Sequence, residues 1–141
     1  MKIQVKKIDP TSSIPTVALE GDAGLDLRAN EDVILKPGER KSIKTGLAIK
    51  IPTGYAGLIW DKSGIAHKKG LKTLGGVIDA NFTGEWQVGL VNLSREDYQI
   101  KKGDKIAQVL FQKVEIPQIE IVAELETTIR GEKGFGSTGL K

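Results

Sequence analysis

The chain has 141 residues, of which 39% are hydrophobic and 28% charged, with no cysteine, a single histidine and a formal net charge of +3. These values predict one globular domain and exclude disulfides, thiolate metal sites and multi-histidine metal centres. The positive charge is too small and too evenly spread to indicate nucleic-acid binding. No apolar run approaches the roughly 20 residues of a membrane span, and the N-terminus lacks the apolar core of a signal peptide. Composition therefore predicts a cytoplasmic domain that binds neither nucleic acid nor membranes.

Short runs rich in β-branched residues alternate with turn sequences along most of the chain. Turns are indicated by segments such as Lys36-Pro-Gly38 and Lys101-Lys-Gly-Asp104. The clearest runs between the turns are residues 47–51, 86–92, 106–111 and 119–122. Alternation with period two and turns every 8–12 residues or so predicts an all-β fold, either a sandwich or a barrel.

One short helix is predicted from Ser63 to residue 69. Ser63 is a suitable N-cap, and Gly70 is a suitable residue to end the helix. Because Lys62 precedes a Ser-Gly pair at the helix start, this segment could bind an anion. An ordinary capped surface helix is the simpler interpretation.

The C-terminal segment Arg130-Gly-Glu-Lys-Gly-Phe-Gly-Ser-Thr-Gly139 is rich in glycine and carries two hydroxyls. It contains the Gly-x-Gly-x-x-Gly pattern of dinucleotide-binding folds, but no helix can follow it, so that interpretation is excluded. Backbone N–H groups of such a segment can surround a phosphate while the Phe135 ring covers a flat group. A flexible chain end is the alternative.

Two aspartates are candidate functional groups. Asp79 follows an apolar run and precedes a turn, where it either projects from the rim of a sheet or closes an Asx-turn. Strand alternation puts Asp26 and Arg28 on one face, where they form an ion pair or where the carboxylate binds Mg²⁺ directly or through water. Phe82, by itself, is either a packing residue or a platform for a ligand. Gln108 is either an ordinary outward-facing strand residue or a ligand contact.

Five segments in this order resemble the motifs of the homotrimeric dUTP pyrophosphatase (dUTPase) family, over nearly the whole chain. The segments are Ala23-Gly-Leu-Asp26-Leu-Arg-Ala29, Lys62-Ser-Gly64, Gly76-Val-Ile-Asp79-Ala-Asn-Phe82-Thr-Gly84, Ile106-Ala-Gln108 and Arg130 to Gly139. The resemblance implies a jelly-roll-like β domain over residues 1–129 and a mobile lid over residues 130–141. It also implies a trimer whose tail reaches a neighbouring subunit.

The resemblance further implies that the protein hydrolyses dUTP to dUMP and pyrophosphate with Mg²⁺. Asp79 would activate the water that attacks the α-phosphorus, and Asp26 would act on Mg²⁺ through its water shell. Phe82 would lie beneath the deoxyribose and leave no room for a 2′-hydroxyl. Uracil would be recognised largely through backbone groups of the third-motif hairpin, with contacts at Thr73, Gly76, Val77, Ile78 and Gln87. The phosphates would contact Lys62, Ser63, Gly64, Gln108, Arg130, Ser137 and Thr138, while Phe135, followed by Gly136, would stack on the base.

Three residues depart from the usual motifs. Lys62 stands where the family usually has arginine, Phe82 where it has tyrosine, and Lys133 where it has glycine. Lysine keeps the charge of arginine but loses its bidentate geometry, so the phosphate contact at residue 62 is altered. A dCTP deaminase-related enzyme and a non-catalytic trimeric nucleotide-binding module are the alternative functions.

Overall fold

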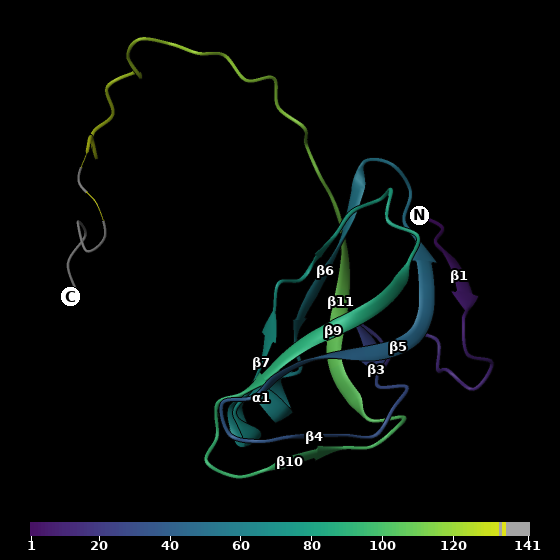
Figure 1. The fold of residues 1–141 in the computed structure, drawn as a ribbon. Helices are drawn as coiled ribbons and strands as arrows, with labels where there is room; N and C mark the ends of the chain where they lie inside the picture. Colours follow the sequence, from purple (N-terminus) through teal and green to yellow (C-terminus); the bar gives the residue numbers. More distant parts are fainter. Residues whose placement is uncertain (133, 135–141) are drawn as a thin grey trace.

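Two antiparallel sheets enclose one hydrophobic core in the computed structural model, which describes residues 1–132 and 134 (Figure 1). One sheet has the strand order β1-β5-β9-β7, formed by Gln4–Lys7, Arg40–Lys50, Glu85–Asn92 and Leu71–Leu74. The other has the order β2-β3-β11-β6-β8, formed by Thr16–Val17, Leu25–Arg28, Lys105–Lys113, Tyr55–Asp61 and Val77–Ile78. A separate pair joins β4 (Val33–Leu35) to β10 (Tyr98–Ile100). The predicted all-β class is confirmed.

The core forms where the alternating side chains of both sheets point inward. On β9, Trp86, Val88 and Leu90 are buried, whereas the intervening Gln87 is exposed. Inward residues of β5 and β11 complete the same cluster, among them Ile43, Ile49 and Val109. Burial of this apolar surface is the main stabilising contribution to the fold.

The helix α1 spans Ser63–Lys69, as the sequence predicts. Its N-cap is Lys62 rather than Ser63, and no side chain caps the helix, so the predicted capping role of Ser63 is wrong. Gly70 ends the helix in the left-handed region, at φ 70°. Glycine favours this conformation because it has no Cβ.

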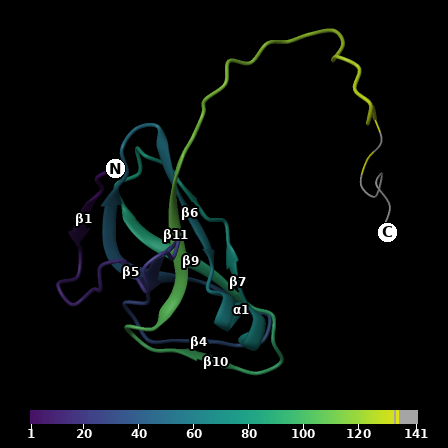
Figure 2. The same ribbon diagram turned by 180° about the vertical axis from the view of Figure 1, so that it is seen from behind.

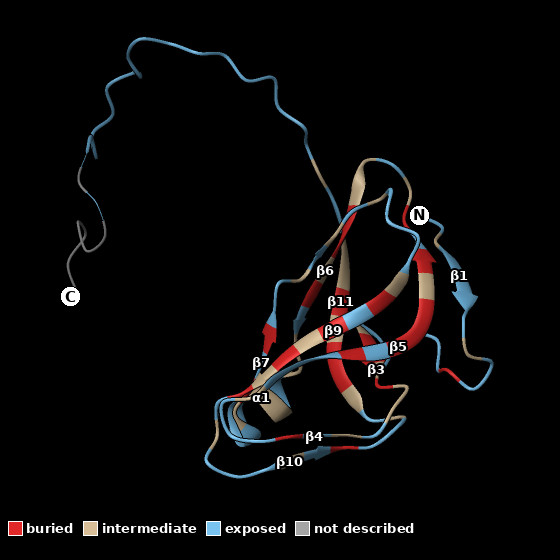
Figure 3. Ribbon diagram, viewed as in Figure 1, coloured by how far each residue is buried: buried red, intermediate tan, exposed pale blue. Residues whose placement is uncertain are grey.

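Beyond β11 the chain leaves the sheets as an extended segment, the C-terminal arm (residues 114–132). Figure 1 and Figure 2 show the arm departing from the end of β11 that lies opposite α1. Figure 3 shows it as almost wholly exposed, and its large apolar side chains beyond Val114 are at least 48% accessible; they are Ile116, Ile119, Ile121, Val122, Leu125 and Ile129. The predicted strand at 119–122 is wrong, because no strand in the described part of the chain pairs with it.

Within residues 1–132 and 134, no helix has the length and apolarity needed to span a membrane. The predictions for Lys133 and for Phe135, Gly136, Ser137 and Thr138 lie outside the described residues.

Candidate active site

The buried carboxylate of Asp26 is paired with two lysines near the start of α1. Asp26 on β3 is 2% exposed. Its Oδ1 accepts a hydrogen bond from Nζ of Lys62, and its Oδ2 forms an ion pair with Nζ of Lys105 at 2.6 Å. Arg28 instead donates to the backbone oxygen of Gly103 at 2.7 Å, so the same-face pair of Asp26 with Arg28 is not formed.

The two ammonium groups determine the charge state of Asp26. Burial by itself would raise the pKa of this carboxyl, but contacts with Lys105 and Lys62 outweigh burial and hold the pKa below its usual value. The carboxylate is therefore ionised at neutral pH. One negative and two positive charges leave a net positive charge there, which favours a polyanionic ligand.

Gln108 and the start of α1 lie beside this carboxylate. Gln108 on β11 pairs in register with Asp26 on β3 and donates from Nε2 to the backbone oxygen of Asp61 at 3.0 Å. A Cβ at Gly24 would lie 2.5 Å from Oε1 of Gln108, so only glycine permits this approach without a shift of the glutamine. Ser63 and Gly64, the first residues of α1, follow Lys62 directly. The structure thus brings together the predicted residues of the first, second and fourth motifs.

Asp61 is a site residue that the sequence analysis missed. Its Oδ1 accepts hydrogen bonds from the backbone N and Oγ1 of Thr73, at 2.7 and 2.6 Å. Its Oδ2 accepts one from Nζ of Lys72 at 2.7 Å. Burial would raise the pKa of Asp61, but the bonds from Lys72 and Thr73 lower it overall. No local sequence pattern indicates this role, because the partners of Asp61 lie more than ten residues away in the chain. We call Asp26, Asp61, Lys62, Lys72, Lys105 and Gln108 the Asp26 cluster, which carries two negative and three positive charges.

The third-motif hairpin begins beside this cluster and runs away from it. Thr73, Gly76 and Val77 line a cavity of about 130 Å³, together with residues of β6. Gly76 has φ 125°, and a Cβ there would lie 2.6 Å from the backbone oxygen of Ile59. A larger residue would therefore force apart these two backbone segments. The Ile59 N–H donates to the Gly76 oxygen at 2.7 Å.

Asp79 lies in an exposed turn directly after the two-residue strand β8. The turn, residues 79–82, is closed by a bond from the Phe82 N–H to the Asp79 backbone oxygen at 3.1 Å; we call it the Asp79 turn. Within the part of the chain that the structure describes, the Asp79 carboxylate accepts no hydrogen bond, so the Asx-turn interpretation is not supported. The Phe82 ring lies over Gly84, where a Cβ would be 2.8 Å from the ring. Phe82 is 43% exposed and is therefore not a core residue.

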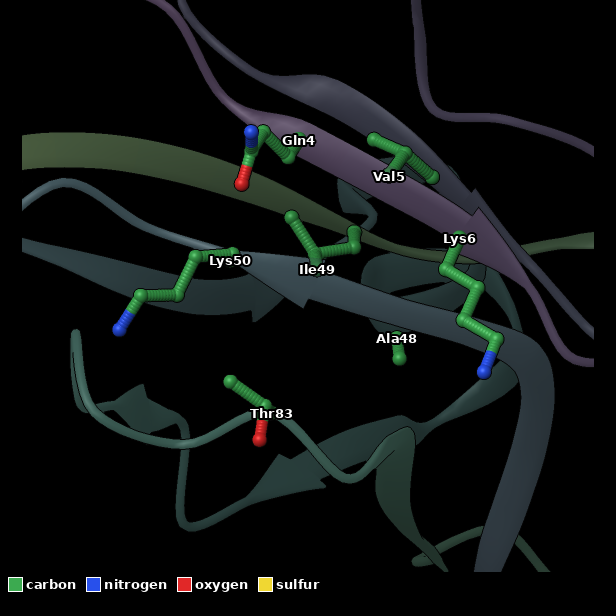
Figure 4. Close-up of a pocket in the computed structure, with 7 residues that line it drawn as sticks. All are labelled: Gln4, Val5, Lys6, Ala48, Ile49, Lys50 and Thr83. Atoms are coloured by element: carbon green, nitrogen blue, oxygen red, sulfur yellow. The ribbon is translucent and has the colours of Figure 1, made fainter.

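One lysine connects the Asp79 turn to the body of the protein. Lys50, the last residue of β5, donates from Nζ to the backbone oxygen of Ala80 at 2.7 Å. Figure 4 shows its side chain extending away from Lys6, toward the loop that leads into Thr83, at one end of a cavity of about 220 Å³.

The Asp26 cluster and the Asp79 turn are far apart in one chain. Ile78 pairs with Gly57 on β6, and Lys62 follows five residues further along. At about 3.3 Å per strand residue, this places Asp79 roughly 15–20 Å from Lys62. A single chain therefore does not place the candidate base beside the candidate phosphate-binding residues.

Comparison with known proteins identifies the family of this chain. A family model described as dUTPase matches residues 11–139. The chain belongs to the dUTPase family. A deoxyuridine 5′-triphosphate nucleotidohydrolase of Corynebacterium glutamicum is 44% identical to it over 140 residues, which cover 97% of this chain and 94% of the relative.

Solved dUTPase structures share the fold over the full chain. The dUTPase of Staphylococcus bacteriophage 80alpha, determined with the nucleotide analogue dUpNHpp, matches with a TM-score of 0.92 and 32% identity, covering 99% of each chain. A mutant dUTPase of phage phi11 of S. aureus, described with a structural Mg(II) ion, matches with a TM-score of 0.84 and 29% identity over 90% of this chain and all of that one. The predicted family and fold are confirmed.

Two further predicted site residues, Gln87 and Arg130, belong neither to the Asp26 cluster nor to the Asp79 turn. Gln87 on β9 is exposed and lines a different cavity, with Arg40 and Ser42 of β5. Arg130, beyond the middle of the C-terminal arm, donates to the backbone oxygen of Gly134 at 3.1 Å.

Proposed function

We propose that this dUTPase-family protein hydrolyses dUTP to dUMP and pyrophosphate at sites shared between the copies of a homotrimer. The observation that carries the proposal is the division of the family's motif residues between two distant ends of one chain. The Asp26 cluster supplies cations and an amide, whereas the Asp79 turn supplies a carboxylate and an aromatic ring. A complete site then requires the Asp26 cluster of one copy and the Asp79 turn of another.

The Asp26 cluster is suited to the triphosphate. Lys62, the N–H groups of Ser63 and Gly64, and the Gln108 amide are donors that can hold phosphate oxygens. Arg130, Ser137 and Thr138 would add donors from the tail of a neighbouring copy. Since phosphoryl transfer depends mostly on positioning and charge neutralisation, this concentration of donors is the main requirement.

The Asp79 turn is suited to the reacting water and the nucleoside. The Asp79 carboxylate takes a proton from a water whose oxygen attacks the α-phosphorus. The bond from that phosphorus to the bridging oxygen breaks, and pyrophosphate leaves. Phe82 would lie beneath the deoxyribose, where a rigid ring leaves no space for a 2′-hydroxyl. Backbone groups from Thr73 to Ile78, with Gln87, would recognise uracil, and Phe135 with Gly136 would cover it.

Mg²⁺ is the expected cofactor, and the residues fit it only through water. Both oxygens of Asp26 are in contact with ammonium groups, so direct coordination would displace a lysine. The described residues contain no group of three or more histidine or acidic side chains that could hold a metal ion. Mg²⁺ commonly keeps several waters and binds through one or two carboxylates and substrate phosphates. When bound it would neutralise phosphate charge, with Asp26 holding its waters.

The C-terminal arm supports the trimer. Its isoleucine and leucine side chains are exposed in one chain, which leaves several large apolar side chains in contact with water. Packing on a neighbouring copy would bury these side chains. The same path would carry the residues beyond 130 toward that copy's site.

Pyrophosphate release from a panel of nucleoside triphosphates tests the activity. We expect Mg²⁺-dependent release from dUTP and little from dCTP, dTTP or UTP. Absence of release from dUTP by the purified trimer would refute the proposal, and ammonia release from dCTP would indicate a deaminase instead. Analytical ultracentrifugation of the same preparation measures the oligomeric state.

A further inference from the structure

The Asp26 cluster contains more positive charge than the buried carboxylate needs. Asp26 is almost fully buried, and either Lys62 or Lys105 alone would neutralise it. The two lysines approach different oxygens of the carboxylate, so they do not compete for the same position. The second lysine therefore requires a separate explanation.

The cost of leaving a buried carboxylate unpaired provides that explanation. Removing the only partner of a buried charge destabilises a protein strongly, because the remaining charge loses both water and its counter-charge. If Lys62 were the only partner of Asp26, its movement to a substrate phosphate would incur this cost. With Lys105 in place, Asp26 keeps a cation while Lys62 leaves.

The backbone positions of the two lysines indicate which one moves. Lys62 is the N-cap of α1, next to the N–H groups of Ser63 and Gly64, whereas the exposure of the two side chains is similar, 30% for Lys62 and 36% for Lys105. Lys105 belongs to β11, and its backbone is in register with Arg28 of β3. Lys62 thus lies where the proposed function puts phosphate, whereas Lys105 is held in the strand ladder beside Asp26.

We propose that Lys105 is a positioning residue, which keeps Asp26 paired so that Lys62 can release it and bind the phosphates of dUTP. The inference rests on the proposed function, since it assumes that Lys62 binds substrate phosphate. It assigns Lys105 no contact with substrate.

Equilibrium binding in the presence of EDTA tests this role without turnover or metal. The probes are dUpNHpp, which carries the triphosphate, and deoxyuridine, which has none. Lys105→Met should weaken dUpNHpp binding by about tenfold and leave deoxyuridine binding unchanged. Lys105→Arg should bind like the parent protein because it retains a cation at Asp26. Lys102→Met, which removes an exposed ion pair with Asp9, is the matched control.

The double variant Asp26→Asn/Lys105→Met decides between positioning and direct contact. Without the carboxylate, Lys62 no longer leaves a buried charge unpaired, so dUpNHpp affinity should return toward that of Asp26→Asn alone. If the double variant stays as weak as Lys105→Met, Lys105 contacts phosphate itself and the proposal is overturned. Equal loss of deoxyuridine binding in Lys105→Met would also overturn it. Thermal melting of each trimer checks folding, and Lys105→Gln replaces Lys105→Met if that variant does not fold.

The parent protein separates the two proposals. If it binds no dUpNHpp and releases no pyrophosphate from dUTP, the proposed function itself fails. If it does both and only the Lys105 series departs from expectation, the failure belongs to the positioning role.

Discussion

The Asp26 cluster and the Asp79 turn are built in contrasting ways. Asp26 is buried between strands of one sheet, and both of its oxygens are in contact with ammonium groups. Asp79 is exposed on a turn that follows a strand of two residues, and its carboxylate accepts no hydrogen bond from the described residues. Both aspartates belong to the family's motif segments. Among the described residues, however, only the Asp26 carboxylate has side-chain partners.

This contrast indicates how the two carboxylates function. A buried, paired carboxylate holds cations in place and contributes to stability, whereas an exposed carboxylate is accessible to water and to substrate. The surroundings that Asp79 lacks in one chain are those that a second copy would provide under the proposed function. The predictions below test this difference, starting with the largest expected effect.

Removing the proposed base should have the largest effect on activity. Asp79→Asn should lower kcat for dUTP by about 10²–10⁴-fold, because general-base assistance to the attacking water is lost. Its melting temperature should not change, since the side chain is exposed. Steady-state kinetics and calorimetry measure both. Asp97→Asn, another exposed aspartate, should keep full activity, and a kcat within threefold of the parent in Asp79→Asn would exclude Asp79 as the base.

Mixed trimers test whether the site is shared between copies. Deletion of residues 130–141 should preserve the trimer but abolish most turnover, because the tail donors and Phe135 are lost. If the turn and the tail of one site belong to different copies, refolding this variant with Asp79→Asn in equal amounts should restore about a quarter of the parent activity, since random assembly then pairs an intact turn with an intact tail at about one site in four. Each variant refolded alone is the control. No recovery in the mixture would mean that turn and tail act within one chain.

The sequence predicted the fold well where local pattern determines structure. Alternation located β9 and most of β11, and the signals at Ser63 and Gly70 located α1. It failed where structure depends on contacts between residues that are distant in the chain. Residues 119–122 have the composition of a strand, but no strand among the described residues pairs with them.

The sequence also missed the polar contacts that organise the site. Asp61 was overlooked because Thr73 and Lys72 approach it only when β6 and β7 come together. Strand alternation offers Arg28 as one possible partner of Asp26, whereas in the structure the lysines reach Asp26 from α1 and β11. Motif order thus identified Asp26, Lys62 and Gln108, but their pairing, and the places of Asp61 and Lys105 beside them, depend on tertiary structure.

Acid should weaken the Asp26 cluster through Asp61. The folded pKa of Asp61 is lowered, so its contribution to the free energy of unfolding is present above the unfolded pKa of about 3.9 and is lost as pH falls through the folded value. Asp61→Asn should lower the free energy of unfolding by about 1–2 kcal/mol at pH 7 and reduce its decline in acid. Urea unfolding between pH 2 and 7 measures both. Thr73→Val, which keeps the backbone donor, should show a smaller loss of the same sign, and an unchanged acid profile in Asp61→Asn would contradict the assignment.

The smallest expected effect concerns Lys50, because its bond to the Ala80 oxygen is exposed and links the Asp79 turn to the rigid strand β5. The bond restrains the residue next to the proposed base without occupying the site. Lys50→Met should therefore lower kcat by about three- to fivefold and leave KM within twofold. Lys50→Arg should recover the loss because it can still donate to the carbonyl oxygen. Lys6→Met is the matched control, since Lys6 lines the same cavity but extends the other way (Figure 4). A larger change in KM than in kcat would show that Lys50 acts on substrate binding rather than on the position of the Asp79 turn.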